Sequence, residues 1–156
     1  MPKLKQGLIV AGLVIALDQL SKYAIMQAFM LGDYIAVTPF FDLVRAHNSG
    51  AAFSLFADQS GWQRAFFITI ALFASGIIIH MLRRDAGSVH FKLALSLILG
   101  GALGNVIDRI LHGHVVDFLY FHINQYYWPA FNVADAAITI GAGLLIWDSF
   151  RKPARS

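Results

Sequence analysis

The sequence predicts an all-α membrane protein with four transmembrane helices and a small β-containing extracytoplasmic segment. Of its 156 residues, 58% are hydrophobic and only 13% are charged, and the mean hydropathy is +0.62. That balance is too apolar for an ordinary soluble domain of this length. Four long apolar runs follow one another along the chain. A chain this short is expected to form one domain, covering residues 1–156.

The first predicted span covers about residues 7–31. The polar stretch DQLSK at 18–22 divides this run into pieces that are too short to cross a bilayer separately, so we expect one helix. Lys3 and Lys5 before an apolar stretch also resemble a secretory signal peptide. No clear small-residue cleavage site follows Leu17, and further spans follow, so a retained first span is expected.

The other three spans are expected at 65–82, 91–111 and 132–150. The 65–82 run lies between Arg64 and Arg83, and its 18 residues would cover roughly 27 Å as a helix, about the thickness of the hydrocarbon core. The two later runs are also long and apolar, but each has polar residues gathered at one end. They are therefore expected to cross the membrane and to carry function at one rim.

Lysine and arginine residues set the expected orientation. With four spans, the basic residues near the span ends fall on one side of the membrane, which the positive-inside rule assigns to the cytoplasm. These residues are Lys3, Lys5, Arg83, Arg84, Lys92, Arg151, Lys152 and Arg155. Both termini are then cytoplasmic, and segments 32–63 and 112–131 lie together on the outer side.

The two outer segments differ in character. YIAV at 34–37 and FFDLVRA at 40–46 are β-prone and predict a hairpin or small sheet. The second segment is rich in aromatic residues, which suit a belt at the lipid headgroups, and we expect it to lie along the membrane surface. These aromatic residues are Phe118, Tyr120, Phe121, Tyr126, Tyr127, Trp128 and Phe131.

Composition also excludes several kinds of chemistry. The net charge is only +3, and the basic residues form no single run, so nucleic acid is not an expected partner. The absence of cysteine excludes disulfides, zinc–thiolate sites and cysteine nucleophiles. All nine acidic residues are aspartates, and several stand inside apolar runs, where an ionisable group is costly and indicates a functional site.

The third span carries a polar stripe at its outer end. Asn105, Asp108, Arg109 and His112 stand at positions i, i+3, i+4 and i+7, which share one face of a helix. Arg109 could neutralise Asp108. The stripe could then be a buried ion pair and amide that hold helices together, or it could take part directly in catalysis.

Three smaller features accompany this stripe. Gly100 and Gly104 have the G-x-x-x-G spacing that permits close helix contact. Asp18 and Lys22 are an i, i+4 pair that could form an interfacial salt bridge. Asn48, in NSGAAF, is either a turn residue or a hydrogen-bonding group of a substrate or active site.

Two aspartates can meet on the outer side. Asp117 stands in VVDF, and Asp135 stands in FNVADAAI, where Asn132 suits an N-cap and helix capping alone could explain Asn132 and Asp135. Asp117 alone could be a surface charge. Two neighbouring carboxyl groups do not easily both ionise, so one can activate water while the protonated one hydrogen-bonds a scissile carbonyl. This aspartic peptidase chemistry needs no metal, and no cofactor is expected.

Other readings of the polar residues stay open. His112 and His114 could bind metal, but without an HExxH helix they suit solvated loop positions better. Ser49 or Ser21 with Lys22 could form a serine–lysine peptidase. Intramembrane acids also mark small transporters, although here they crowd at one rim instead of the midplane. A structural or chaperone-like bundle is the last alternative.

Five strings together resemble a known family. DQLSK, NSGAAF, GGALGNVIDR, VVDF and FNVADAAI occur in the order and with the spacings of lipoprotein signal peptidase, also called signal peptidase II. The resemblance covers residues 18–138. It implies an aspartic endopeptidase of the bacterial inner membrane, with its site on the periplasmic or outer side.

The resemblance also implies a substrate and roles for particular residues. The substrates would be prolipoproteins that carry a diacylglyceryl group on a cysteine, cut just before that cysteine. Asp117 and Asp135 would be the catalytic dyad, globomycin-type cyclic peptides would inhibit by lodging between them, and the chain would act as a monomer among membrane lipids. The residues that would bind substrate or support the site are Asn48, Asn105, Asp108, Arg109, Asn132, Asp18 and Lys22.

Overall fold

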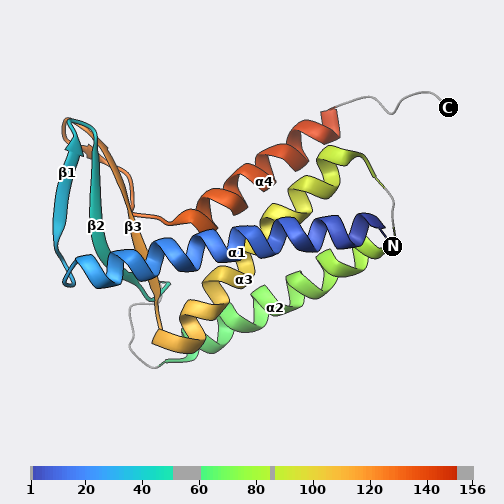
Figure 1. Cartoon of the computed structure of the whole chain (residues 1–156), viewed down its shortest axis with the longest axis horizontal. Coiled ribbons are helices and arrows are strands. Elements are labelled where there is room, and N and C mark those ends of the chain that lie inside the picture. The colour runs from blue at the N-terminus through green and yellow to red at the C-terminus, as the bar shows by residue number, and fades with distance from the viewer. Residues whose placement is uncertain (1, 51–60, 85–86, 151–156) are drawn as a thin grey trace.

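The computed structural model describes residues 2–50, 61–84 and 87–150, and it consists of four helices and one small sheet (Figure 1). The elements in chain order are α1 (Pro2–Ala28), β1 (Tyr34–Thr38), β2 (Phe41–Asn48), α2 (Trp62–Arg83), α3 (Val89–His112), β3 (Val115–Ile123), β4 (Tyr126–Tyr127) and α4 (Val133–Phe150).

All four helices are long and apolar enough to cross a membrane, so the predicted fold class is confirmed. The helix starting at Pro2 begins before the predicted range of 7–31 and stops earlier, at Ala28. It stops there because the chain turns at once: the backbone N–H of Met30 donates to the carboxylate of Asp33 at 2.7 Å, and Gly32 has a φ of +89°.

Helix α3 lies at the centre of the bundle and contacts the other three helices. Small residues on α3 permit this. A Cβ at Gly100 would lie 2.8 Å from the carbonyl oxygen of Ala11 in α1, and a Cβ at Gly101 would strike the carbonyl of Ala134 in α4. Gly104 likewise leaves room for the carboxylate of Asp18. The predicted close contact at Gly100 and Gly104 is therefore confirmed, with α1 as the partner.

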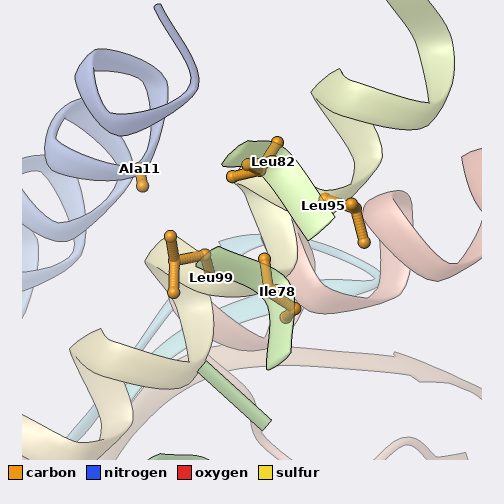
Figure 2. Close-up of a cluster of buried hydrophobic side chains, with 5 residues drawn as sticks. All are labelled: Ala11, Ile78, Leu82, Leu95 and Leu99. Carbon is orange, nitrogen blue, oxygen red and sulfur yellow. The ribbon is translucent and has the colours of Figure 1, made fainter. Parts of the chain in front are cut away.

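Away from the sheet, apolar side chains hold α1, α2 and α3 together. Figure 2 shows Ala11 of α1 beside Ile78 and Leu82 of α2 and Leu95 and Leu99 of α3. All five side chains are buried. Many other large apolar side chains on the helices are exposed, which is the pattern of a bundle whose outer surface meets lipid.

The sheet joins the two outer segments. Its order is β1-β2-β3-β4, and every neighbouring pair is antiparallel. The predicted hairpin at 34–46 is confirmed as β1 and β2. Segment 112–131 was predicted to lie along the membrane surface as an aromatic belt, and its strands were missed. The run VVDFLYFHI has the β-branched and aromatic composition of a strand, but aromatic residues also suit a membrane interface. As β3, this run pairs with β2, and Phe121 packs on Phe41 with ring centroids 4.7 Å apart.

Arg45 attaches the sheet to the first helix. Between Leu43 and Ala46 the β2–β3 register shifts by one residue, a β-bulge that bends the strand. The Arg45 guanidinium donates to the carbonyls of Met26 at 3.1 Å and Phe29 at 2.7 Å, at the end of α1 where carbonyls lack helical partners. The sheet therefore sits at one end of the bundle, and α1 starts and α4 ends at the other (Figure 1).

The glycine contacts predict that two glycine-to-alanine substitutions differ in their effect on the stability of the fold. Gly101→Ala would push a methyl group into the backbone of α4 and is expected to destabilise the fold by about 1–3 kcal/mol. Gly143→Ala is the control, because no atom lies within 4 Å of its Cβ position and alanine favours a helix by about 0.5–1 kcal/mol. Thermal unfolding in detergent should show a lower melting temperature for the first variant only. Equal melting temperatures would contradict the close α3–α4 contact.

Candidate active site

Asp117 is a buried carboxylate held by two asparagine amides. It lies in β3 with a side chain only 2% exposed. One carboxylate oxygen accepts a hydrogen bond from Nδ2 of Asn132 at 2.7 Å, and the other accepts one from Nδ2 of Asn48 at 3.0 Å. The oxygen of Asn48 accepts from the backbone N–H of Gly50 at 2.8 Å, so this amide is fixed with its NH₂ towards Asp117. Asn48 is thus both a turn residue and a partner of Asp117.

Asn132 and Asp135 begin α4. The side-chain oxygen of Asn132 accepts from the backbone N–H of Asp135 at 2.9 Å, so the predicted N-cap is confirmed. The Asn132 amide thus has two uses, because its NH₂ donates to Asp117. Asp135 is only partly buried, and Oδ1 of its carboxylate accepts from Nδ2 of Asn105 at 2.7 Å. Capping and the carboxylate site are therefore one arrangement and not alternatives.

The charge of Asp135 acts on the carboxyl group of Asp117. Burial is the main cause that raises the pKa of Asp117, and the negative charge of Asp135 raises it further. The hydrogen bonds from Asn48 and Asn132 lower it, and the result is a pKa of about 6. The two acids that the sequence analysis singled out are therefore close enough for the charge of Asp135 to act on Asp117.

A second polar cluster lies between α1 and α3, next to Asp117 and Asp135. It consists of a buried ammonium and two carboxylates. Nζ of Lys22 is 2.8 Å from an oxygen of Asp18, 2.8 Å from an oxygen of Asp108 and 3.1 Å from the amide oxygen of Asn105. Its three protons therefore have three acceptors. The predicted salt bridge between Asp18 and Lys22 is confirmed, but it is buried instead of interfacial, and Lys22 also pairs with Asp108 in α3.

The two carboxylates beside Lys22 also accept hydrogen bonds from the backbone next to Asp117 and Asp135. An oxygen of Asp108 accepts from the backbone N–H of Val116 at 3.0 Å, one residue before Asp117. An oxygen of Asp18 accepts from the backbone N–H of Ala134 at 2.9 Å, one residue before Asp135. Through these bonds one buried ion cluster positions both the strand and the helix that carry the two acids.

Gln19 is a member of this site that the sequence interpretation missed. Its Nε2 lies 2.8 Å from Oδ1 of Asp108, 3.2 Å from an oxygen of Asp18 and 3.2 Å from the carbonyl of Gly104. Two carboxylates share one ammonium here, and the Gln19 amide supplies further donors to both. The available signal was an amide inside an apolar run directly beside an aspartate.

Arg109 does not form the direct ion pair with Asp108 that the sequence suggested, although the charges of Asp135, Asp108 and Asp117 all act on it. The guanidinium donates to the backbone carbonyl of Asn105 at 3.3 Å and lies over the ring of Phe67 in α2, 5.0 Å from its centroid. Asp108 takes Lys22 instead, since it faces α1. Arg109 therefore stands at the edge of the hydrogen-bonded network that joins the other predicted site residues.

The histidines form a stack and not a set of separate loop residues. The ring of His114 lies 3.6 Å from that of His47 in β2, and the His112 ring lies 6.0 Å from that of His114. Burial is the main cause that lowers the pKa of His47 and of His114, and neighbouring basic groups lower it further. His114 lies in the bend between α3 and β3 and is half-buried, and His112 is exposed at the end of α3.

The proposed serine–lysine pairing is not formed. Oγ of Ser21 donates to the backbone carbonyl of Asp18 at 2.9 Å, and the Lys22 ammonium already has three other acceptors. Ser49 is exposed in the turn after β2. The rest of NSGAAF, residues 51–53, lies outside the part of the chain that the structure describes.

Four helices able to span a membrane, with two neighbouring acids at one end of them, are the features expected of a multi-pass membrane peptidase of the aspartic class. A family model described as signal peptidase (SPase) II matches residues 10–151. The chain therefore belongs to the signal peptidase II family, as the five strings indicated, and it is an aspartic endopeptidase of the bacterial inner membrane. Family membership decides against the transporter and the structural bundle that the polar residues left open.

Individual relatives agree over most of the chain. The lipoprotein signal peptidase of Janthinobacterium sp. (strain Marseille) is 52% identical over 143 residues, which are 92% of this chain and 87% of the relative. That of Ralstonia nicotianae is 55% identical over 141 residues, 90% of this chain and 82% of the relative. A bacterial membrane enzyme solved by the in meso method at 1.9 Å resolution is 33% identical, with a TM-score of 0.84 over 96% of this chain and 95% of that one.

The raised pKa of Asp117 predicts how stability depends on pH. Its folded pKa of about 6 lies above the usual 3.8, so the folded protein binds this proton more tightly than the unfolded chain does. That contribution is complete below about pH 4 and is lost as the pH rises through 6, a change of about 3 kcal/mol for a shift of this size. Asp117→Asn should remove this pH-dependent part, and denaturant unfolding in mixed micelles across the range measures it. Parallel stability curves for the two proteins would contradict the shift.

Proposed function

We propose that this chain is a single-domain endopeptidase that removes signal peptides from diacylglyceryl-modified prolipoproteins, cutting before the lipidated cysteine with Asp117, Asp135 and an activated water. The observation that carries the proposal is the coupling of the two acids. Asp117 and Asp135 come from different elements, one amide (Asn132) connects them, and the charge of one raises the pKa of the other. Coupled carboxyl groups of this kind suit acid–base hydrolysis.

The two acids divide the work of hydrolysis. The ionised carboxylate takes a proton from water, whose oxygen attacks the carbonyl carbon of the scissile bond. The protonated carboxyl donates its proton to the carbonyl oxygen and so stabilises the tetrahedral intermediate. The C–N bond then breaks as the carboxyl that took the proton from water gives it to the leaving nitrogen, and a hydroxyl of the intermediate returns its proton to the other carboxylate, which restores the starting pair. The products are a signal peptide with a new carboxylate and a lipidated cysteine with a free α-amine.

The remaining polar residues serve as supports in this proposal. Asn48 and Asn132 orient Asp117, and Asn105 orients Asp135 by donating to its carboxylate. Asp18, Lys22 and Asp108 hold the backbone beneath, and Arg109 brings a cation to the rim of the site. Such fixed neighbours reduce the reorganisation that the reacting groups need.

The position of the site suits a lipid-anchored substrate. Both acids lie where the helices end and the sheet begins, and a cysteine tethered by acyl chains holds its scissile bond at the headgroup level (Figure 1). The bilayer thereby supplies part of the alignment. We further propose that the chain works as a monomer, that both termini are cytoplasmic with the site outside, and that globomycin-type cyclic peptides bind between the two acids.

Neutral replacement of either acid tests the dyad. Asp117→Asn and Asp135→Asn keep the side-chain size but remove a titratable proton, so each should lower turnover of a lipidated prolipoprotein peptide by at least about two orders of magnitude. The double variant should be little worse than either single one. Asp42→Asn is the matched control in the same sheet, because Asp42 pairs with His122 and not with the site.

These assays would also expose a different chemistry. EDTA should leave wild-type activity unchanged, since the proposed steps use only carboxyl groups and water. Cleavage by either dyad variant near the wild-type rate, at any pH, would remove the two-aspartate assignment. Loss of activity with EDTA that zinc restores would redirect attention to the histidine stack.

The proposed orientation can be read from single thiols, because the native chain has no cysteine. Gln125→Cys places a thiol in the exposed turn between β3 and β4, and Arg84→Cys places one at the exposed end of α2. An impermeant maleimide added to intact spheroplasts should label the first variant and should reach the second only after permeabilisation. The reverse labelling pattern would invert the topology. Asp58, the other outer position considered for a label, lies outside the described residues.

A further inference from the structure

Helix α2 contributes a side chain to the surroundings of both acids, although no site residue was predicted on it. This side chain is Phe67, which lies in the second turn of α2 and is half-buried. Its ring contacts the turn that follows β2 and the guanidinium of Arg109 in α3. The first contact leads to Asp117, and the second leads to Asp135.

The contact with the turn is made to Gly50. A Cβ placed on Gly50 would strike Cε2 of the Phe67 ring and would lie 2.9 Å from Cδ2. Gly50 also has a φ of +98°, a conformation that residues with a side chain rarely adopt. The edge of the ring therefore lies directly against the glycine backbone, and the turn cannot move towards α2.

Gly50 in turn holds the amide of Asn48. Its backbone N–H donates to Oδ1 of Asn48 at 2.8 Å, and Nδ2 of Asn48 donates to the carboxylate of Asp117 at 3.0 Å. A side-chain amide has a donor and an acceptor on different atoms, and rotation would present its oxygen to the carboxylate. The bond from Gly50 prevents that rotation, so a displacement of Gly50 would weaken the hydrogen bond to Asp117.

The guanidinium of Arg109 holds the ring from the side of α3. It lies over the ring at 5.0 Å from the centroid, a distance at which a cation is attracted to an aromatic face. Arg109 also donates to the backbone carbonyl of Asn105 at 3.3 Å, and the amide of Asn105 donates to Asp135 at 2.7 Å. Phe67 thus lies between the residues that support Asp117 and those that support Asp135.

We propose that Phe67 is a positioning residue of the active site, which acts by keeping the Asn48 amide on Asp117. This inference rests on the proposed function, because it concerns the reaction of the two acids. Without the ring, Gly50 would lose the surface against which it packs and Arg109 would lose its aromatic partner. The amide would then spend less time on the carboxylate, and the site would be less well aligned for hydrolysis.

The pKa of Asp117 depends on this hydrogen bond. Burial and then the charge of Asp135 raise that pKa, whereas the hydrogen bonds from Asn48 and Asn132 and the charge of Lys22 lower it. Asn132 and Lys22 are held by contacts in which the ring takes no part. Loss of the ring is therefore expected to act on Asp117 through Asn48 and to raise its pKa.

Removal of the ring, with a matched control on the same helix, tests the proposal. Phe67→Leu and Phe67→Met remove the ring but keep an apolar side chain that suits a spanning helix. Phe73→Leu makes the same change at a side chain that is 72% exposed. Asn48→Ala removes the amide itself. For each full-length protein, kcat/KM for a lipidated prolipoprotein peptide is measured across pH, and the melting temperature in detergent reports the fold.

Phe67→Leu should lower kcat/KM by about tenfold. It should also move to higher pH the same limb of the pH profile that Asn48→Ala moves, because kcat/KM reports the groups of the free enzyme. Phe73→Leu should match the wild type. In the double variant Asn48→Ala with Phe67→Leu, the second change should add little to the first.

Several results would overturn the inference. A lower rate with an unchanged pH profile, or loss of the fold in both ring-less variants, would assign Phe67 to stability alone. Losses that add in full in the double variant would show that Phe67 does not act through Asn48. Wild-type cleavage with unaffected Phe67 variants would reject this inference only, whereas a wild-type protein that does not cleave the peptide would reject the proposed function together with it.

Discussion

The rest of the site depends on the buried ammonium of Lys22. An unpaired charge would be very costly in the interior of a membrane protein, and this one is accommodated because each of its protons meets an oxygen. The acceptors come from α1 and α3, and the two carboxylates among them also accept from the backbone N–H of the second residue of β3 and of α4. Four elements are thus joined at one point, and loss of one partner would leave an uncompensated buried charge, which typically costs about 3–5 kcal/mol.

The surroundings of the two acids differ, and this difference suits an acid–base pair. Asp117 is buried between two amide donors, whereas Asp135 is partly exposed and, among the described residues, accepts a hydrogen bond from the amide of Asn105. Sites that separate the protonation of two carboxyl groups do so through unequal burial and hydrogen bonding. Here the difference in burial between the two acids follows from the fold. Asp117 lies within a strand of the sheet, whereas Asp135 lies on the first turn of a helix.

The sequence was sufficient for the spans, the first hairpin and most of the polar residues that the structure brings together, but not for most of their partners. Apolar length determines spans directly, whereas β3 was obscured because valine, phenylalanine and tyrosine suit strands and membrane interfaces alike. Local spacing suggested Asp108 with Arg109, yet the partner of Asp108 is Lys22, 86 residues away by number. That pairing depends on how α1 and α3 are rotated against each other. The glycine contacts between the two helices determine this rotation, and the sequence of either helix alone does not reveal it. Gln19 was missed for the same reason.

The two uses of Asn132 constrain how this enzyme can diverge. Its oxygen starts α4 and its nitrogen holds Asp117, so the position needs an acceptor and a donor on one short side chain. Aspartate would keep the cap but would lose the donor and add a third negative charge, and alanine would lose both. A serine hydroxyl is both donor and acceptor, but on one atom, whereas the asparagine amide places the two on different atoms, so none of these replacements reproduces both hydrogen bonds in place. A lineage that changes this residue must therefore change its neighbours as well, so drift at the site is expected in coordinated steps.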